Sequence, residues 1–197
     1  MRAGEPVLVA MTGATGAVYG IRLLETLREL GAESHLVISR WAEATIRTET
    51  DRTPAEVKAL ATRVYDEDDL AAAPASGAFA TTAMVVAPCS MRTLAAVANG
   101  LADNLIQRAA EVHLQERRRL ILLVRESPLS TIQLENMLRV ARAGAVVAPP
   151  VPAFYARLRS LDDMVDHTVG RVLDLAGVEH ERIRRWGERR AGLRRVD

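Results

Sequence analysis

Cysteine is almost absent from this sequence of 197 residues, since Cys89 is the only one. A single thiol cannot form an internal disulfide, which suits a reducing compartment. Aromatic residues make up 4% of the chain, so a core must be built mostly from Ala, Val, Leu and Ile. No apolar run approaches the roughly 20 residues of a membrane-spanning helix, and nothing resembles a signal peptide. We therefore expect a cytoplasmic protein that does not enter a membrane.

Lysine is equally scarce. Lys58 is the only lysine among 26 Lys and Arg residues, and no motif surrounds it, so Schiff-base or general-base chemistry by a lysine is not expected. The formal net charge of +1 gives no general electrostatic reason to bind nucleic acid. The arginine-rich segment 182–195 is better explained as a solvated helix face or a subunit contact.

What the sequence does contain is a regular alternation of short apolar runs and segments with helical periodicity. Strands are predicted at residues 6–11, 34–39, 84–87, 120–124 and 145–148, with Pro88 stopping the third. Helices are predicted at residues 17–30, 41–49, 54–63, 92–98, 103–117, 130–143 and 161–176. This alternation predicts an α/β, Rossmann-like (flavodoxin-like) three-layer fold, a parallel sheet covered by helices on both faces. We expect a single domain over residues 1–197.

Ligands in such sheets bind beyond the carboxyl ends of the strands. The turn Gly13-Ala14-Thr15-Gly16 leaves the first strand there, and the helix that follows offers free N–H groups to an anion. Its spacing fits neither the dinucleotide fingerprint nor a P-loop. A tight turn without any ligand explains these residues equally well.

The segment from Ser90 to Thr93 forms a second strand-to-helix junction, where both hydroxyls can cap the helix or hold a phosphate. Cys89 beside it is interpreted as a packed side chain, because no His–Asp pair accompanies it. The four histidines show no metal-ligand spacing, so no metal site is predicted.

Charged residues mark further positions. Arg125 and Glu126 follow another strand and indicate a polar site, with a structural ion pair as the alternative. Arg108 and Arg171 lie on predicted helices among small or apolar residues, so each is expected to be paired or to bind a phosphate.

Taken in order, several segments resemble the UbiX-like flavin prenyltransferases, especially the B subunits of phenolic acid decarboxylases. The resemblance runs from about Val7 to Trp186, and its segments are MTGATGAVYGIRLLETL, LVIS, TETD, SGAF, MVVAPCSMRTLAAVANGLADNLIQRAAEV, ERRRLILLVRESPLSTIQLENM and GAVVAPPVPAFYARLRSLDDMVDHTVGRVLD. It implies a homododecamer with FMN at the subunit interface, and transfer of a dimethylallyl group from dimethylallyl phosphate to N5 and C6 of reduced FMN. The product, prenylated FMN, would serve a UbiD-like decarboxylase.

The resemblance also assigns roles to residues. The positions that match flavin-binding ones are Gly13, Ala14, Thr15, Ser39, Ser90, Met91, Arg92, Thr93 and Arg125. Tyr155 and Arg171 match residues that hold the substrate phosphate, with Arg108 contributing from a neighbouring chain. Glu49 and Glu126 match acidic residues implicated in catalysis, and Trp41 and Trp186 are candidates for walling the allyl group.

The sequence departs from the family pattern at four positions. Gln115 replaces a lysine that contacts the substrate phosphate, Gln133 replaces a histidine, and Ser127 replaces a threonine. Thr15 replaces the serine of the first turn, a mild change that keeps the hydroxyl. Losing one cation from a phosphate site would cost on the order of 1–3 kcal/mol. Two alternatives therefore stay open: an FMN-binding protein that has lost prenyl transfer and delivers flavin to a partner, and an FMN-dependent decarboxylase of the cysteine-decarboxylase type. Whether the donor is a monophosphate or a diphosphate is also open.

Overall fold

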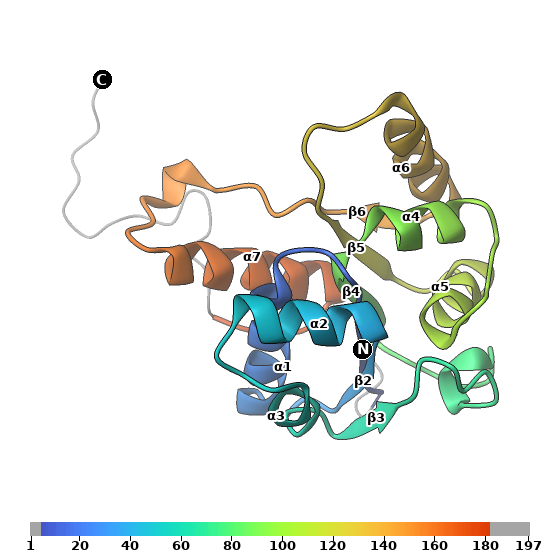
Figure 1. Ribbon diagram of the computed structural model, residues 1–197. Coiled ribbons are helices and arrows are strands. Elements are labelled where there is room, and N and C mark those ends of the chain that lie inside the picture. The colour runs from blue at the N-terminus through green and yellow to red at the C-terminus, as the bar shows by residue number, and fades with distance from the viewer. Residues whose placement is uncertain (1–4, 182–197) are drawn as a thin grey trace.

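Six parallel strands form one sheet in the computed structural model, which describes residues 5–181, in the order β3-β2-β1-β4-β5-β6 (Figure 1). The strands are β1 (Val7–Met11), β2 (Ser34–Ile38), β3 (Arg63–Tyr65), β4 (Ala83–Cys89), β5 (Leu120–Val124) and β6 (Val146–Val147). Without the short edge strand β3, the remaining order is that of flavodoxin-like sheets, and with it the order is that of dinucleotide-binding sheets. The predicted fold class is confirmed.

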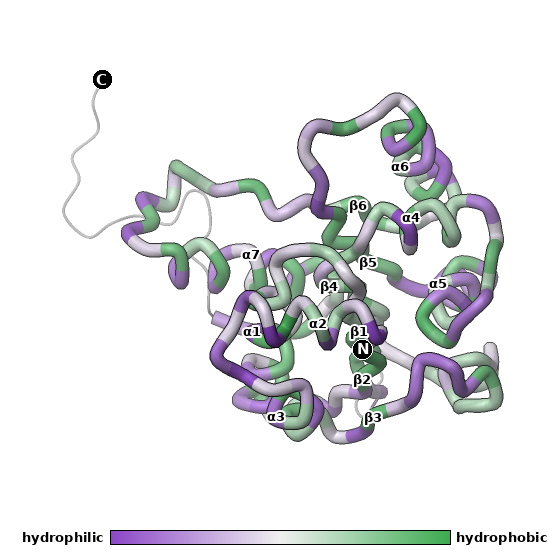
Figure 2. The backbone as a smooth tube through the Cα atoms, in the orientation of Figure 1, coloured by the Kyte–Doolittle hydropathy of each residue, from purple (hydrophilic) through white to green (hydrophobic). Residues whose placement is uncertain are grey.

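Helices cover both faces of the sheet, as Figure 1 shows, and the central strands β1, β4 and β5 are mostly hydrophobic (Figure 2). The helices are α1 (Ala17–Glu29), α2 (Arg40–Glu49), α3 (Pro54–Lys58), α4 (Met91–Ala98), α5 (Leu105–Gln115), α6 (Thr131–Ala143) and α7 (Leu161–Ala176), with short 3-10 turns η1 (Ala73–Ala75) and η2 (Phe154–Ala156). Alternate residues of each strand point to opposite faces. In β1, Val7, Val9 and Met11 pack with α1 and α7, while Leu8 and Ala10 pack with α4 and α5.

The strand order reverses between β1 and β4, which creates a crevice at their carboxyl ends. Thr12, directly after β1, closes the bottom of this crevice. Its hydroxyl donates to the Pro88 carbonyl at 2.9 Å and accepts from the Ser90 amide at 2.8 Å. One buried side chain therefore fixes the loop after β1 against the loop after β4.

Two sequence predictions were wrong in this part of the chain. The helix predicted at 54–63 ends at Lys58, and Arg63–Tyr65 forms the edge strand β3, which was not predicted. The strand predicted to stop before Pro88 continues to Cys89. Proline lacks an amide hydrogen but keeps its carbonyl, and the Pro88 carbonyl accepts hydrogen bonds from the backbone and side chain of Thr12.

Within residues 5–181, no helix has the length and hydrophobicity needed to cross a bilayer. Trp186 and the arginine-rich segment 182–195 lie outside the described residues. The prediction of a single domain over 1–197 stays a prediction.

Candidate functional site

A cavity of about 710 Å³ opens at the crevice between β1 and β4. Ligand pockets in proteins commonly measure roughly 300–1,000 Å³. Its walls bring together six of the predicted flavin-binding residues, namely Gly13, Ser39, Ser90, Met91, Arg92 and Thr93. These residues come from the loops that follow three different strands, so only the folded sheet places them around one space.

A second cavity of about 290 Å³ adjoins the first, between the turn after β1 and helix α2. Ala14, Thr15 and Glu49 line it. Gly13 and Trp41 line both cavities, so these two residues lie on the partition between them. A side chain at Gly13 would collide with the Trp41 Cβ atom, so glycine is required by this close packing.

The amino terminus of α1 is occupied by a carboxylate of the protein itself. Glu49, at the end of α2, accepts hydrogen bonds from the amides of Gly16 at 2.8 Å and Ala17 at 3.0 Å with one oxygen, Oε2. The sequence left open whether this turn binds a ligand anion or is only a tight turn, and it did not predict that a carboxylate of the chain would bind these two amides. An acidic side chain placed there satisfies the unpaired amides and the helix dipole.

Helix α2 begins in the same way. The Glu67 carboxylate accepts from the Arg40 amide at 2.5 Å, and the Ser39 hydroxyl accepts from the Ala42 amide at 3.1 Å. Sequence reasoning missed Glu67 because it follows β3, the strand that was not predicted. Its position after a strand would have identified it.

Helix α4 differs, since within residues 5–181 no carboxylate is bound to its first amides. Ser90 caps the helix by accepting from the Thr93 amide at 3.2 Å, as predicted, and the two hydroxyl oxygens lie 3.1 Å apart. Met91 and Arg92, the first two residues of α4, line the large cavity. Among α1, α2 and α4, the helices that follow β1, β2 and β4, only α4 has a start with no carboxylate on its first amides within residues 5–181, which suits an external anion.

Two side chains near the cavity were given no chemical role by the sequence. Lys58 lines the cavity and its Nζ donates to Glu43 Oε1 at 2.7 Å, so the one lysine is held in an ion pair. Cys89 is fully buried, and burial raises the pKa of its thiol to about 12. The thiol is therefore protonated at neutral pH, in agreement with the packed role predicted for it.

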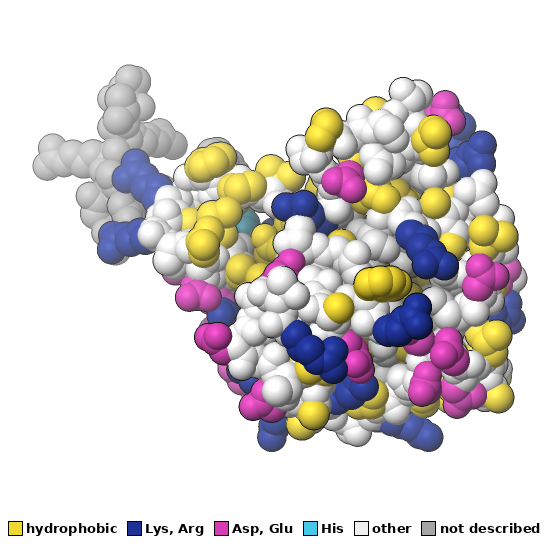
Figure 3. Space-filling model, viewed as in Figure 1, with side chains coloured by type: hydrophobic (Ala, Val, Ile, Leu, Met, Phe, Trp, Pro, Cys, Tyr) yellow, Lys and Arg dark blue, Asp and Glu magenta, His cyan; other side chains and the backbone are white. Residues whose placement is uncertain are grey.

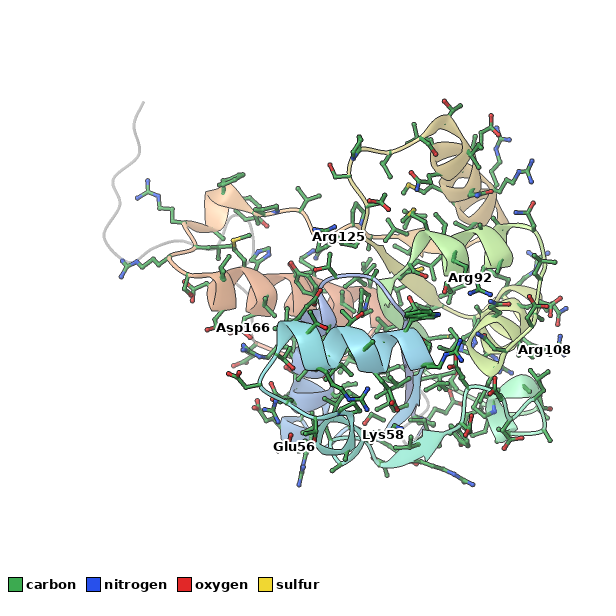
Figure 4. All side chains as sticks on the ribbon, viewed as in Figure 1. Glu56, Lys58, Arg92, Arg108, Arg125 and Asp166 are labelled. Atoms are coloured by element: carbon green, nitrogen blue, oxygen red, sulfur yellow. The ribbon has the colours of Figure 1, made fainter. Side chains whose placement is uncertain are left out.

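The remaining predicted residues lie outside both cavities. Figure 4 shows Arg125 beyond the end of β5 and Arg108 farther away on α5. Arg125 lies close enough to Tyr19 that its charge opposes the increase in the Tyr19 pKa that burial causes. No ion pair joins Arg125 to Glu126 in the described part of the chain. Glu126 instead accepts from the Ser127 amide at 3.0 Å.

Tyr155 and Arg171 stand near the far end of the chain, on η2 and α7. The Tyr155 hydroxyl lies 3.4 Å from His167 Nε2. Arg171 donates to Asp174 at 2.7 Å and Arg108 donates to Glu111 at 2.7 Å, so both arginines are paired, which is one of the two roles expected for them. Their phosphate-binding role stays a prediction.

Comparison with known proteins identifies the family. The Flavoprotein family model matches residues 1–173. A probable UbiX-like flavin prenyltransferase from Bacillus subtilis (strain 168) is 53% identical over 91% of this chain and 88% of its own length. The flavin prenyltransferase UbiX from Archaeoglobus fulgidus is 51% identical over 91% of this chain and 98% of its own. The chain is a UbiX-like flavin prenyltransferase family member.

Solved UbiX-like structures agree with this assignment. The crystal structure of AnUbiX (PadA1) in complex with FMN and dimethylallyl pyrophosphate is 54% identical, with a TM-score of 0.88 over 92% of this chain and 98% of that one. A dodecameric FMN-dependent UbiX-like decarboxylase from Escherichia coli O157:H7 is 51% identical, with a TM-score of 0.89 over 92% of this chain and 98% of that one. The peptidyl-cysteine decarboxylase EpiD, at 17% identity and a TM-score of 0.65, shows the shared fold alone.

The departures from the UbiX-like pattern have different structural settings. Gln133 accepts from the Ser130 amide at 2.8 Å while the Ser130 hydroxyl accepts from the Gln133 amide, which caps α6 from both sides. Glutamine is well suited to that position. Gln115 is the exposed last residue of α5 and its side chain makes no hydrogen bond within residues 5–181, so the structure gives no reason for this substitution.

Proposed function

We propose that this protein is a flavin prenyltransferase, which joins a dimethylallyl group from dimethylallyl phosphate to N5 and C6 of reduced FMN. The observation that carries the proposal is the pair of adjoining cavities at the β1–β4 crevice. The larger one is polar and presents the open amino terminus of α4, and the smaller one ends at the carboxylate of Glu49. The first suits a phosphorylated flavin, and the second a short apolar group beside an acid–base residue.

In this proposal the flavin is held by the loops that converge on the large cavity. The amides of Met91 and Arg92 and the hydroxyls of Ser90 and Thr93 are polar donors at a helix amino terminus, where an anion is favoured. The turn Gly13–Thr15, Ser39 and Arg125 complete the flavin contacts. Trp41, 60% exposed on the partition between the cavities, would shield the allyl group from water.

Prenyl transfer breaks the bond between the allylic carbon and the phosphate oxygen, so charge develops on the departing phosphate. Arg171 and Tyr155 are proposed to stabilise that charge, with Arg108 supplied by a neighbouring subunit. Forming bonds at both N5 and C6 also requires protons to leave the flavin and one to reach the allylic double bond. Glu49 and Glu126 are the proposed carriers of these protons, Glu126 by way of the departing phosphate.

The proposal includes assembly into a dodecamer like that of the Escherichia coli O157:H7 relative. Helix α6 buries only Asn136 and Val140, whereas Ile132 is 71% exposed and Leu134 and Leu138 are each 50% exposed. Hydrophobic side chains gather over α6 and over the segment before α7 (Figure 3). Several large exposed apolar side chains on one helix are what a subunit interface would cover. A UbiD-like decarboxylase is the proposed recipient of the prenylated flavin.

Gln115 favours one competing function, an FMN-binding protein that has lost prenyl transfer. It leaves a neutral amide where the family pattern has a cation for the substrate phosphate. The retention of Glu49, Tyr155 and Arg171 supports the enzyme instead, because a protein that only delivers flavin has no need of a second phosphate site.

The deciding experiment is anaerobic incubation of the purified protein with reduced FMN and dimethylallyl monophosphate, followed by mass spectrometry of the extracted flavin. A mass increase of one five-carbon prenyl unit is expected. Unmodified FMN, tightly bound, from both the monophosphate and the diphosphate donor would favour the flavin-delivery protein. Rescue of transfer by Gln115→Lys would then locate the defect in the phosphate site.

A further inference from the structure

Glu67 is a carboxylate of the large cavity to which the proposed function gives no chemical role. It lies in the loop after β3 and lines the cavity together with Asp66 and Asp68. Its side chain accepts from the amide of Arg40, the first residue of α2, at 2.5 Å. Its backbone carbonyl accepts from the amide of Leu105, the first residue of α5, at 2.7 Å. One residue therefore occupies the first amide of two helices that begin beside the cavity.

The positive charges of this cavity lie toward α4 and Trp41. Arg92 is the second residue of α4 (Figure 4). The guanidinium of Arg40 lies 5.7 Å from the centre of the Trp41 ring, next to the wall that the two cavities share. Neither arginine forms an ion pair within residues 5–181. Lys58 also lines the cavity, but its ion pair with Glu43 at 2.7 Å neutralises it.

The remaining wall of the cavity is acidic. Apart from the loops after β1, β2 and β4 and the Lys58–Glu43 pair, it consists of the loop after β3 and the start of α5. The carboxylates of this wall are Asp66, Glu67, Asp68 and Asp103, and none of them forms an ion pair in the described part of the chain. An anion placed against this wall would therefore meet negative charges with no cation beside them.

We propose that Glu67 is a specificity-determining residue that restricts the large cavity to flavins with one phosphate group, so that the protein selects FMN over FAD. The inference rests on the proposed function in one respect, because it takes the flavin phosphate to bind at the start of α4.

The reason lies in where a second phosphate would have to go. FAD carries a further phosphate and an adenosine beyond the phosphate at which FMN ends. With the first phosphate at α4 and the flavin ring toward Gly13 and Trp41, the added group is left with the acidic wall. A sheet with this strand order can accommodate a dinucleotide, and a helix start such as that of α2 is where its second phosphate would bind.

Glu67 closes that position in two ways. Its carboxylate takes the Arg40 amide that a phosphate oxygen would need, and its charge repels the phosphate itself. Discrimination between two ligands that share most of their contacts commonly depends on such a repulsive group, placed where only the unwanted ligand reaches.

Calorimetric titration of the flavin-free protein with oxidised FMN and with FAD tests the inference. Glu67→Gln keeps an oxygen for the Arg40 amide and removes the charge, and Asp68→Asn removes a second charge from the same wall. Asp69→Asn is the matched control, since Asp69 lies in the same loop, accepts from the Ala71 amide at 3.0 Å and does not line the cavity. The quantity compared is the Kd for FAD divided by the Kd for FMN, which a general loss of stability leaves unchanged.

The wild-type protein is expected to bind FMN more tightly than FAD. Glu67→Gln should lower the ratio roughly tenfold, the effect of removing one repulsion between charges near a protein surface, and Asp68→Asn should lower it about threefold. Asp69→Asn should stay within about twofold of wild type. Added salt should lower the ratio of the wild type more than that of Glu67→Gln, because salt screens the repulsion.

Equal affinity of the wild type for FMN and FAD would overturn the inference. A ratio that is the same in the wild type and both variants would also overturn it, because the exclusion of FAD would then be steric and Glu67 only a helix cap. If Glu67→Gln fails to fold, Asp68→Asn and the salt dependence of the wild type decide. If the wild type binds FMN without converting it, prenyl transfer fails and the ratio still decides the role of Glu67. If it does not bind FMN, both fail.

Discussion

Glu49 has a structural role as a helix cap and a proposed catalytic role as an acid–base residue, and substitution can separate the two. One carboxylate oxygen accepts from the amides of Gly16 and Ala17 at the start of α1, and the same carboxylate lines the small cavity. Glu49→Ala removes an amino-terminal cap, which costs about 1 kcal/mol, and an anion at the helix dipole, which costs about 0.5 kcal/mol. In a protein of this size the sum of about 1.5 kcal/mol corresponds to a Tm lower by roughly 3–6 °C.

Glu49→Gln keeps one carbonyl oxygen for both amides and loses only the charge. Its Tm should fall by about 1–2 °C, a difference that added salt should shrink because salt screens the dipole interaction. Prenyl transfer should nevertheless fall by roughly 100-fold or more, the usual size of a general acid–base contribution. Scanning calorimetry at one fixed protein concentration and single-turnover flavin analysis measure the two effects. An unchanged Tm in Glu49→Ala, or equal Tm losses in both variants, would refute the capping argument.

Four further outcomes follow from the structure. Burial lowers the pKa of His113 to about 4, and its ring is bound to Thr81 and Ala109, so as the pH falls the unfolded chain takes up a proton before the folded one. The contribution of His113 to the free energy of unfolding is therefore complete above about pH 6.5 and should decline on the order of 3 kcal/mol between pH 6.5 and 4. Urea titrations of His113→Gln should lack this decline. Cys89 should resist iodoacetamide in the native protein and react only after unfolding, as mass spectrometry would show; rapid native labelling contradicts its burial. Gln115→Lys should lower KM for the phosphate ester about tenfold without altering FMN affinity, and an unchanged KM would mean that Gln115 lies away from the phosphate. Gly13→Ala should weaken FMN binding in a fluorescence titration, and Trp41→Ala should not rescue it, because the collision is with the Trp41 Cβ atom that alanine keeps.

The sheet and most of its helices were predictable because buried parallel strands leave short, bounded apolar runs such as LILLV at β5. β3 was missed because an edge strand of three residues with Arg63 and Val64 exposed has no such signature. The neighbouring residues 59–61 are apolar and extend the helical pattern of α3 beyond its true end. Tertiary pairing with β2, invisible in local sequence, decides that segment.

The candidate site was predictable to the extent that loops after strands converge on one edge. Gly13, Ser39 and the Ser90 segment were placed together correctly by that rule. The occupation of helix starts by Glu49 and Glu67 was not predictable, since it depends on contacts between residues 32 and 27 positions apart. Sequence separation also hides the packing of Trp41 on Gly13, which divides the site in two.

The capped starts of α1 and α2 have a consequence for how two phosphates are told apart. Glu49 and Glu67 already bind the first amides of α1 and α2, so of these three helices α4 is the one with backbone amides left for a ligand anion in the described part of the chain. In the proposed reaction one phosphate belongs to the flavin and stays, while the other departs at every turnover. Backbone amides at the start of α4 suit the flavin phosphate, which stays bound, and side chains such as Arg171 suit the substrate phosphate, which departs. Release of the substrate phosphate therefore need not weaken the binding of the flavin phosphate.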